Sequence, residues 1–169
     1  MLVHPKLTEA VADLIGPNVQ LHHTKLHVKP PEKGSPFPLH QDYDYFPHEK
    51  DTMIAAVIYL EDASEENGCL CVMPGVHAQG PLTHQHDGSH YLSPEEYTIE
   101  EATPCTGKAG DVVLFSYLTP HGSYPNRTSS PRRLVLFQFR SPTDKPLKEV
   151  HISPGQGMMV RGINPALEI

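Results

Sequence analysis

Residues 53–60 read MIAAVIYL, from Met53 to Leu60, and this stretch decides the fold class. It is a nearly continuous apolar run without the alternation of polar residues that marks a half-exposed strand. Such a run is typical of a strand that is buried on both faces. The stretch therefore predicts an interior strand of a sheet.

Four further segments are predicted as short strands: residues 19–28, 69–73, 111–117 and 134–139. Turn-forming residues bound them, and the chain holds 18 prolines and 12 glycines in all. One helix is predicted over Lys6–Ile15, where apolar residues recur at i, i+3, i+4 and i+7 before Gly16-Pro17. Many short strands with little helix favour a mainly β fold, a sandwich or jelly roll.

The length of 169 residues fits one compact domain better than two. The sequence contains no internal repeat. The stretch from Gln79 to Thr106 is polar and weakly periodic, so we expect a long insertion between two strands. Insertions of this length are often lids or binding loops.

Composition and charge exclude several classes of partner. The formal net charge is -7, from 13 basic and 20 acidic residues, which disfavours binding to nucleic acid. No apolar run reaches the ~20 residues of a membrane helix, and the first ten residues lack the pattern of a secretory signal. We therefore expect a cytoplasmic protein. Cys69, Cys71 and Cys105 are an odd, small set, which favours reduced thiols.

Twelve histidines are many for this length, and histidine is the commonest metal ligand. His40 and Asp42 lie two residues apart. On a strand, side chains at i and i+2 point to the same face, so the pair could offer an imidazole and a carboxylate to one ion. The motif alone is weak, because His-x-Asp also occurs by chance.

A second motif runs from the apolar segment Gly110–Phe115 into a turn that holds His121. Arg132 follows eleven residues later, at the head of the next apolar strand. An arginine that enters an apolar strand loses hydration unless it meets an anion, and its planar fork suits a carboxylate. Arg133 would point to the opposite face of that strand.

Together these residues indicate one kind of site. Two histidines and one carboxylate that leave coordination positions open form the facial triad of non-haem Fe(II) oxygenases. The open positions accept a chelating cosubstrate and O2. Arg132, across the hairpin from His121, could anchor the far carboxylate of that cosubstrate.

From about Leu21 to Ser141 the sequence resembles the phytanoyl-CoA dioxygenase family of Fe(II)/2-oxoglutarate hydroxylases. The matching motifs, in order, are His23-Thr24, Lys29-Pro30-Pro31, Pro38–Asp42, Tyr45-Phe46-Pro47, Glu65–Leu70, Met73–His77, Ala109–Phe115, His121-Gly122-Ser123, Asn126 and Arg132.

The resemblance implies a fold, a reaction and a set of cofactors. The fold would be a double-stranded β-helix, a cupin-like jelly roll, with one short N-terminal helix. The cofactor would be Fe(II), with 2-oxoglutarate as cosubstrate. The partners would be O2 and a small organic or acyl substrate, which is hydroxylated at an unactivated C–H. Most of the family's N-terminal helical region is missing, so residues 1–169 are expected to form a single oxygenase domain that lacks part of it.

The resemblance also assigns site residues. His40, Asp42 and His121 match the family's iron ligands, and Arg132 matches the arginine that pairs with the 5-carboxylate of 2-oxoglutarate. Two further positions match contacts to the cosubstrate: Ser123 and Lys25.

Three other functions are alternatives, and Arg132 argues against the first while Asp42 argues against the second. A cupin-like metalloenzyme that does not use 2-oxoglutarate has no need of Arg132. Halogenases of the family lack the carboxylate that Asp42 supplies. A non-catalytic jelly-roll binding module is also compatible with the short N-terminus. A further group, His84, His86 and His90, could bind a second metal, although a solvated loop is the favoured interpretation.

Overall fold

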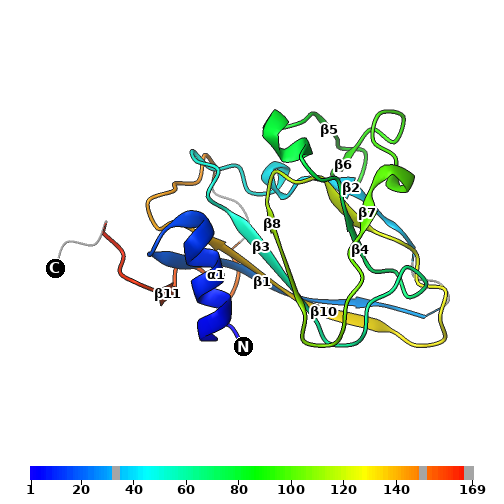
Figure 1. The fold of residues 1–169 in the computed structure, drawn as a ribbon. Coiled ribbons are helices and arrows are strands. Elements are labelled where there is room, and N and C mark those ends of the chain that lie inside the picture. Colours follow the sequence, from blue (N-terminus) through cyan, green and yellow to red (C-terminus); the bar gives the residue numbers. More distant parts are fainter. Residues whose placement is uncertain (32–34, 149–151, 166–169) are drawn as a thin grey trace.

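A computed structural model describes residues 1–31, 35–148 and 152–165. Two antiparallel sheets lie face to face, with the N-terminal helix at one side (Figure 1). The larger sheet has the strand order β11-β1-β10-β3-β8. Its strands are β1 (Val19–Lys29), β3 (Ile54–Tyr59), β8 (Val112–Ser116), β10 (Arg132–Arg140) and β11 (Met159–Arg161).

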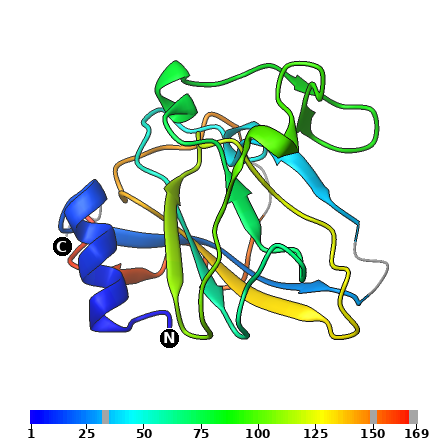
Figure 2. The ribbon, with the colours of Figure 1, turned by 45° about the vertical axis from the view of Figure 1, so that its right-hand side comes forward.

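The smaller sheet has the order β2-β9-β4-β7, and a separate hairpin pairs β5 with β6. The green segment that carries this hairpin lies at one end of the sandwich, where β6 contacts β2 (Figure 2). These strands are β2 (Phe37–His40), β4 (Leu70–Val72), β5 (His84–Gln85), β6 (Tyr91–Leu92), β7 (Thr103–Pro104) and β9 (His121–Ser123). Three short 3-10 helices are η1 (Asp42–Asp44), η2 (Val76–Gln79) and η3 (Ile99–Glu101).

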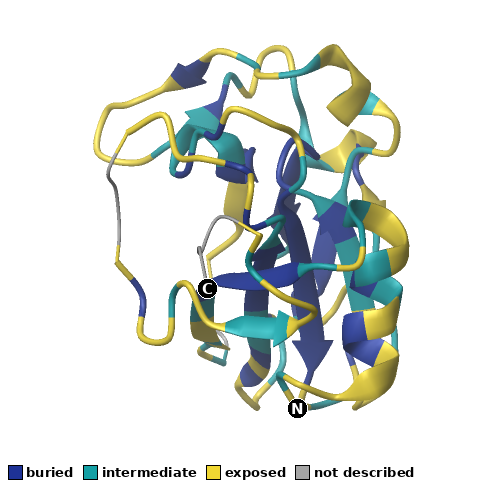
Figure 3. Ribbon diagram, turned by 90° about the vertical axis from the view of Figure 1, so that its left-hand side faces the viewer, coloured by how far each residue is buried: buried dark blue, intermediate teal, exposed yellow. Residues whose placement is uncertain are grey.

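Strand β3 confirms the prediction made from residues 53–60. All six of its residues are buried, and it pairs with β10 on one side and β8 on the other. The middle of the large sheet is correspondingly dark blue in Figure 3. Val57 lies opposite Leu136 of β10 and Val113 of β8, so the strand fills the centre of the sandwich.

The helix α1 (Pro5–Ile15) agrees with the predicted bounds within one residue. Its buried stripe places Leu7 and Val11 against the large sheet, in one cluster with Phe139. Gly16 ends it with φ 99°, a conformation that glycine adopts without strain. In the described ranges, no helix has the length and apolarity needed to cross a bilayer.

Two local predictions about the site were wrong. Asp42 does not continue the strand of His40, because β2 ends there and the backbone turns into η1, where the Tyr45 and Phe46 amides both donate to the Asp42 carbonyl. His121 begins strand β9 instead of lying in a turn, and it pairs with His40. Strands of three or four residues have too little periodicity to reveal pairing with a distant segment.

The insertion over residues 79–106 has more structure than its sequence pattern predicts. It carries β5, β6, η3 and β7, and β7 pairs with β4 as an edge of the smaller sheet. Leu92 and Ala102 are buried in one cluster with Leu39 and Cys71. The segment therefore packs onto the strand that presents His40. All three cysteines are free, as predicted.

Candidate functional site

The structure brings His40, Asp42 and His121 together from β2, η1 and β9. The Nε2 atoms of His40 and His121 lie 3.9 and 3.8 Å from Oδ1 of Asp42. One ligand atom from each residue lies within 4.8 Å of the other two, and all three side chains are buried. Three residues that are separated by up to 81 positions thus surround one point.

Backbone carbonyls fix the orientation of both imidazole rings. Nδ1 of His40 donates to the Pro38 carbonyl at 3.0 Å, and Nδ1 of His121 donates to the Thr119 carbonyl at 2.9 Å. A carbonyl can only accept, so each ring carries its proton on Nδ1 and directs the Nε2 lone pair towards Asp42. Such hydrogen bonds set the tautomer of metal-binding histidines.

The electrostatics of the three groups keep those lone pairs available. Burial lowers the pKa of His40 to about 3, with His121 adding to the effect, and burial lowers the pKa of His121 to about 4. Burial also raises the pKa of Asp42, while His40 and Gln138 oppose the rise. Both imidazoles are therefore neutral at neutral pH, which is the form that binds metals.

Gln138 of β10 holds the carboxylate of Asp42. Its Nε2 donates to Oδ2 of Asp42 at 2.6 Å, and the Gln138 side chain is fully buried. Oδ1 stays directed at the two histidines. Gln138 was not among the residues predicted for the site. The available signal was a polar residue inside the apolar run LVLFQF, which begins at Leu134.

The donor set fits an Fe(II) ion. Two neutral imidazole nitrogens and one carboxylate oxygen are the ligands of the 2-His-1-carboxylate facial triad. Hydrogen bonds from outside this set orient each of the three ligands, as expected of a metal site.

Arg132 marks the other end of the site. It is only 4% exposed, its Nη2 donates to the Gly68 carbonyl at 2.8 Å, and its Nε has no hydrogen-bond partner. No ion pair within the described ranges includes it. Arg133 points to the opposite face, as predicted, and pairs with Glu61 near the surface. A buried guanidinium without a carboxylate fits an anionic ligand.

Lys29 lies beside Arg132 and was not predicted as a site residue. The two residues are paired across β1 and β10. Nζ of Lys29 donates to Oγ of Ser123 at 2.7 Å, to the Ser35 carbonyl at 3.1 Å and to the Tyr124 carbonyl. Burial lowers the pKa of Lys29 to about 8, and the charge of Arg132 adds to this. Lys29, Ser123 and Arg132 therefore form one cationic cluster.

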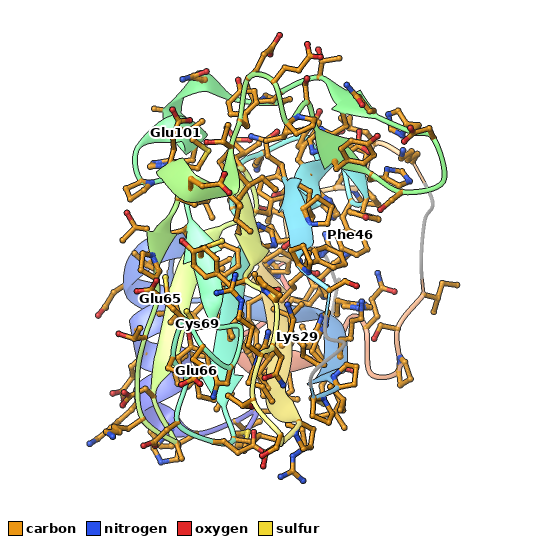
Figure 4. The ribbon with its side chains drawn as sticks, turned by 90° about the vertical axis from the view of Figure 1, so that its right-hand side faces the viewer. Lys29, Phe46, Glu65, Glu66, Cys69 and Glu101 are labelled. Carbon is orange, nitrogen blue, oxygen red and sulfur yellow. The ribbon has the colours of Figure 1, made fainter. Side chains whose placement is uncertain are left out.

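One cavity of about 650 Å³ joins the three metal-binding candidates to the cationic cluster. In Figure 4 Lys29 projects from β1, and Phe46 lies near η1; both line this cavity. Lys25 lines it as well, at the position paired with Leu136, four residues along β1 from Lys29. Its predicted contact with the cosubstrate stays a prediction.

A second group of possible ligands gathers around Asp44. His90 contacts its carboxylate, and Nδ1 of His86 lies 3.7 Å from it. The prediction of a solvated loop was wrong for His84, which is buried and accepts a hydrogen bond at 2.9 Å from the Gln41 amide. The cause is the β5–β6 hairpin, which packs His84 against the backbone between His40 and Asp42.

Comparisons with known proteins agree with one another. The family model described as phytanoyl-CoA dioxygenase (PhyH) matches residues 1–134. A probable alpha-ketoglutarate-dependent hypophosphite dioxygenase of Stutzerimonas stutzeri is 31% identical over 150 residues, which are 84% of this chain and 52% of the relative. The peroxisomal phytanoyl-CoA dioxygenase of Homo sapiens is 33% identical over 148 residues, which are 81% of this chain and 44% of the relative. The chain thus spans about half the length of these curated relatives.

Solved structures share the fold. The apo form of ThoJ, a non-heme monooxygenase, matches with a TM-score of 0.83 and 26% identity, covering 96% of this chain and 60% of that one. EvdO2 from Micromonospora carbonacea var. aurantiaca, complexed with 2-oxoglutarate, matches with a TM-score of 0.69 and 26% identity, covering 90% of this chain and 64% of that one. The predicted jelly-roll fold is confirmed.

Proposed function

This chain belongs to the phytanoyl-CoA dioxygenase family, and on that premise we propose that it is an Fe(II)- and 2-oxoglutarate-dependent dioxygenase. Its reaction is the hydroxylation of an unactivated C–H bond in a small organic or acyl substrate. Residues 1–169 act as a single oxygenase domain. The substrate, 2-oxoglutarate and O2 are the small molecules that it binds.

One observation carries the proposal. A buried set of two histidines and a carboxylate and a buried arginine without a carboxylate partner line the same cavity. The first accepts a divalent ion and the second accepts an anion. A dicarboxylate that chelates a metal at one end and presents a free carboxylate at the other satisfies both.

The metal end of the cavity has three ligands and one supporting residue. His40 and His121 would hold Fe(II) through Nε2, and Asp42 would hold it through Oδ1, while Gln138 fixes the carboxylate. Bound there with 2-oxoglutarate and O2, the ion supplies the oxidant for C–H hydroxylation. The chain contributes orientation and a fixed protonation state of its ligands.

The cationic end positions the cosubstrate. Arg132 binds the 5-carboxylate of 2-oxoglutarate through its guanidinium, supported by Lys29 and by the hydroxyl of Ser123. Apolar side chains line the cavity between the two ends, among them Phe115 and Leu134. They limit access of water to the reacting atoms and strengthen the charge-assisted contacts.

Calorimetric titration of 2-oxoglutarate under nitrogen tests the proposal. Arg132→Ala removes one partner of a buried charge pair, which typically costs ~2–5 kcal/mol of binding. We expect affinity for 2-oxoglutarate to fall by roughly 30- to 5,000-fold while iron affinity stays nearly constant. Arg133→Ala is the matched control and should bind normally, and Arg132→Lys should recover only part of the affinity.

Equal affinity of the wild-type protein and Arg132→Ala for 2-oxoglutarate would remove the proposed role of the arginine. The metal-dependent, cupin-like function without 2-oxoglutarate would then be favoured. A loss of iron affinity in Arg132→Ala would also count against the division of the cavity into two ends.

A further inference from the structure

The charged residues that line the cavity reverse the balance of the whole chain. The protein has 20 acidic and 13 basic residues. The cavity, in contrast, is lined by two carboxylates, those of Asp42 and Asp44, and by four cations. The four cations are Lys25, Lys29, Arg132 and Lys148.

In the proposed function, two of these cations pair with the cosubstrate. Lys29 and Arg132 are paired across β1 and β10 and together face the 5-carboxylate of 2-oxoglutarate. The dianionic cosubstrate and the divalent ion cancel each other in charge. Four cations against two carboxylates then leave two positive charges in the cavity for a further ligand.

Lys25 and Lys148 are the two cations that remain. Both are exposed to solvent while they line the cavity, and within the described ranges neither takes part in an ion pair or a side-chain hydrogen bond. Lys25 acts electrostatically on His27 and on Asp42, so its charge is felt at the metal end. An unpaired ammonium group that lines the cavity can attract an incoming anion.

The strand register separates Lys25 from the cosubstrate anchor. Lys25 pairs with Leu136 and Lys29 pairs with Arg132, so the two pairs lie four residues apart along β1. At ~3.3 Å per residue, the two lysines are about 13 Å apart along the strand. A single carboxylate does not reach both, which leaves Lys25 available to a different molecule.

The remaining cavity wall is largely apolar. Val57, Phe115, Leu134 and Leu136 line it from three neighbouring strands of the large sheet. Apolar walls bury a hydrocarbon body, and a few charged groups fix its orientation. The chemistry of this region therefore matches a molecule with an apolar body and one negatively charged group.

We propose that the substrate is an organic anion whose carboxylate or phosphate group binds Lys25 and Lys148 at the solvent-exposed edge of the cavity. The apolar body then lies along Leu136 and its neighbours, with a C–H bond directed at the metal end. This inference rests on the proposed function and adds the charge class of the substrate to it. It assigns Lys25 to the substrate instead of the cosubstrate.

Matched anionic and neutral probes test this assignment. Hexanoate is compared with hexanamide, and hexyl phosphate with 1-hexanol, by anaerobic calorimetric titration into protein loaded with Fe(II) and 2-oxoglutarate. In the wild-type protein we expect each anion to bind more tightly than its neutral partner. The preference should fall about fivefold in Lys25→Met and in Lys148→Met, the size of an exposed ion pair, and should vanish in the double variant.

Controls separate charge from structure. Lys145 is exposed and lies three residues from Lys148, but it does not line the cavity. The Lys145→Met variant should therefore keep the full preference for anionic over neutral probes. Lys25→Arg should keep most of it. The preference in the wild-type protein should weaken as salt is added, because both lysines are exposed to solvent.

Equal binding of anionic and neutral probes, failure of both anions to bind, or an undiminished preference in the double variant would overturn the proposal. A selective loss of 2-oxoglutarate affinity in Lys25→Met would return that residue to the cosubstrate and also overturn it. Failure of the wild-type protein to bind Fe(II) and 2-oxoglutarate would instead contradict the proposed function. In that case the same probes, titrated into metal-free protein, still report on the two lysines.

Discussion

The two ends of the cavity are built in different ways. At the metal end, His40 and His121 each donate to the carbonyl two residues earlier, of Pro38 and Thr119, so the orientation of each imidazole ring is set locally in the sequence. At the cationic end, Lys29, Ser123 and Arg132 come from three strands, β1, β9 and β10. Short motifs therefore orient the two imidazole rings of the metal end, which the pairing of His40 with His121 brings together, whereas the cationic end has no such local motif and depends on strand register throughout.

This difference has a physical consequence for binding. The metal end offers neutral nitrogens and one carboxylate that Gln138 already holds, so it is organised for an ion. The cationic end keeps Arg132 buried without a carboxylate, so part of its charge is left to be neutralised by a ligand. Changes at one end should therefore affect metal binding, and changes at the other should affect anion binding.

The largest effect is expected at the metal end. His121→Ala removes one of three proposed ligands, and metal affinity should fall by more than about 100-fold, because even partners outside the ligand set contribute ~10- to 100-fold. Anaerobic titration with Fe(II) measures the change. His77→Ala, an exposed histidine of η2, is the control and should bind iron normally. Unchanged iron affinity in His121→Ala would contradict the assignment of His40, Asp42 and His121 as iron ligands.

A somewhat smaller loss is expected from the residue that supports Asp42. Gln138→Leu removes the hydrogen bond to Oδ2, and we expect iron affinity to fall by ~10- to 100-fold. The matched control is Gln20→Leu, which changes another buried glutamine of the same sheet whose amide donates to the Gly157 carbonyl. If both variants lost iron affinity equally, the effect would be one of general stability.

Lys29 gives a pH-dependent effect at the cationic end. Its pKa of about 8 means that it is charged below that pH and becomes neutral as the pH rises through it. A bound anion favours the charged form, so affinity for 2-oxoglutarate should be constant near pH 7 and decline above about pH 8. In Lys29→Met the affinity should be about tenfold lower at pH 7 and the decline should be absent.

Calorimetry of the wild-type protein and Lys29→Met between about pH 6.5 and 9.5 measures this difference, because that range spans the pKa of about 8 that Lys29 has without a bound anion. A decline of equal size in both proteins would assign it to another group. Iron affinity measured in parallel should be the same for both, because Lys29 lies at the end away from the triad.

The smallest effect is expected outside the cavity. Glu61→Gln breaks the ion pair with Arg133 on the exposed face of β10. Exposed pairs contribute ~0–1 kcal/mol, so the free energy of unfolding in urea should change by no more than about 1 kcal/mol. Affinities for iron and for 2-oxoglutarate should stay constant. A large change in either would mean that the two faces of β10 are coupled.

Local sequence patterns predicted most of the metal end and the interior of the fold. The run at Met53–Leu60 and the stripe of Lys6–Ile15 correspond to β3 and α1, because long apolar periodicity reports burial directly. His40 and Asp42 were found through their spacing. Because neighbouring side chains of a strand point to opposite faces, Arg132 was correctly predicted to face the cavity and Arg133 the opposite side.

The rest depends on pairing between distant segments. Lys29 enters the site because β1 and β10 align it with Arg132, and Gln138 reaches Asp42 from 96 residues away. The 3-10 turn at Asp42 and the three-residue strand at His121 are too short to leave a periodic signal. Sequence spacing identifies residue types that suit a ligand, whereas register decides which of them meet.

Anaerobic absorption spectroscopy tests most directly whether one cosubstrate bridges the two ends of the cavity. In the wild-type protein, a charge-transfer band should appear only when Fe(II) and 2-oxoglutarate are both present. In His121→Ala it should be absent, and in Arg132→Ala it should require a much higher concentration of 2-oxoglutarate. Absence of the band in the wild-type protein at saturating Fe(II) and 2-oxoglutarate, or a full band in His121→Ala, would contradict the account.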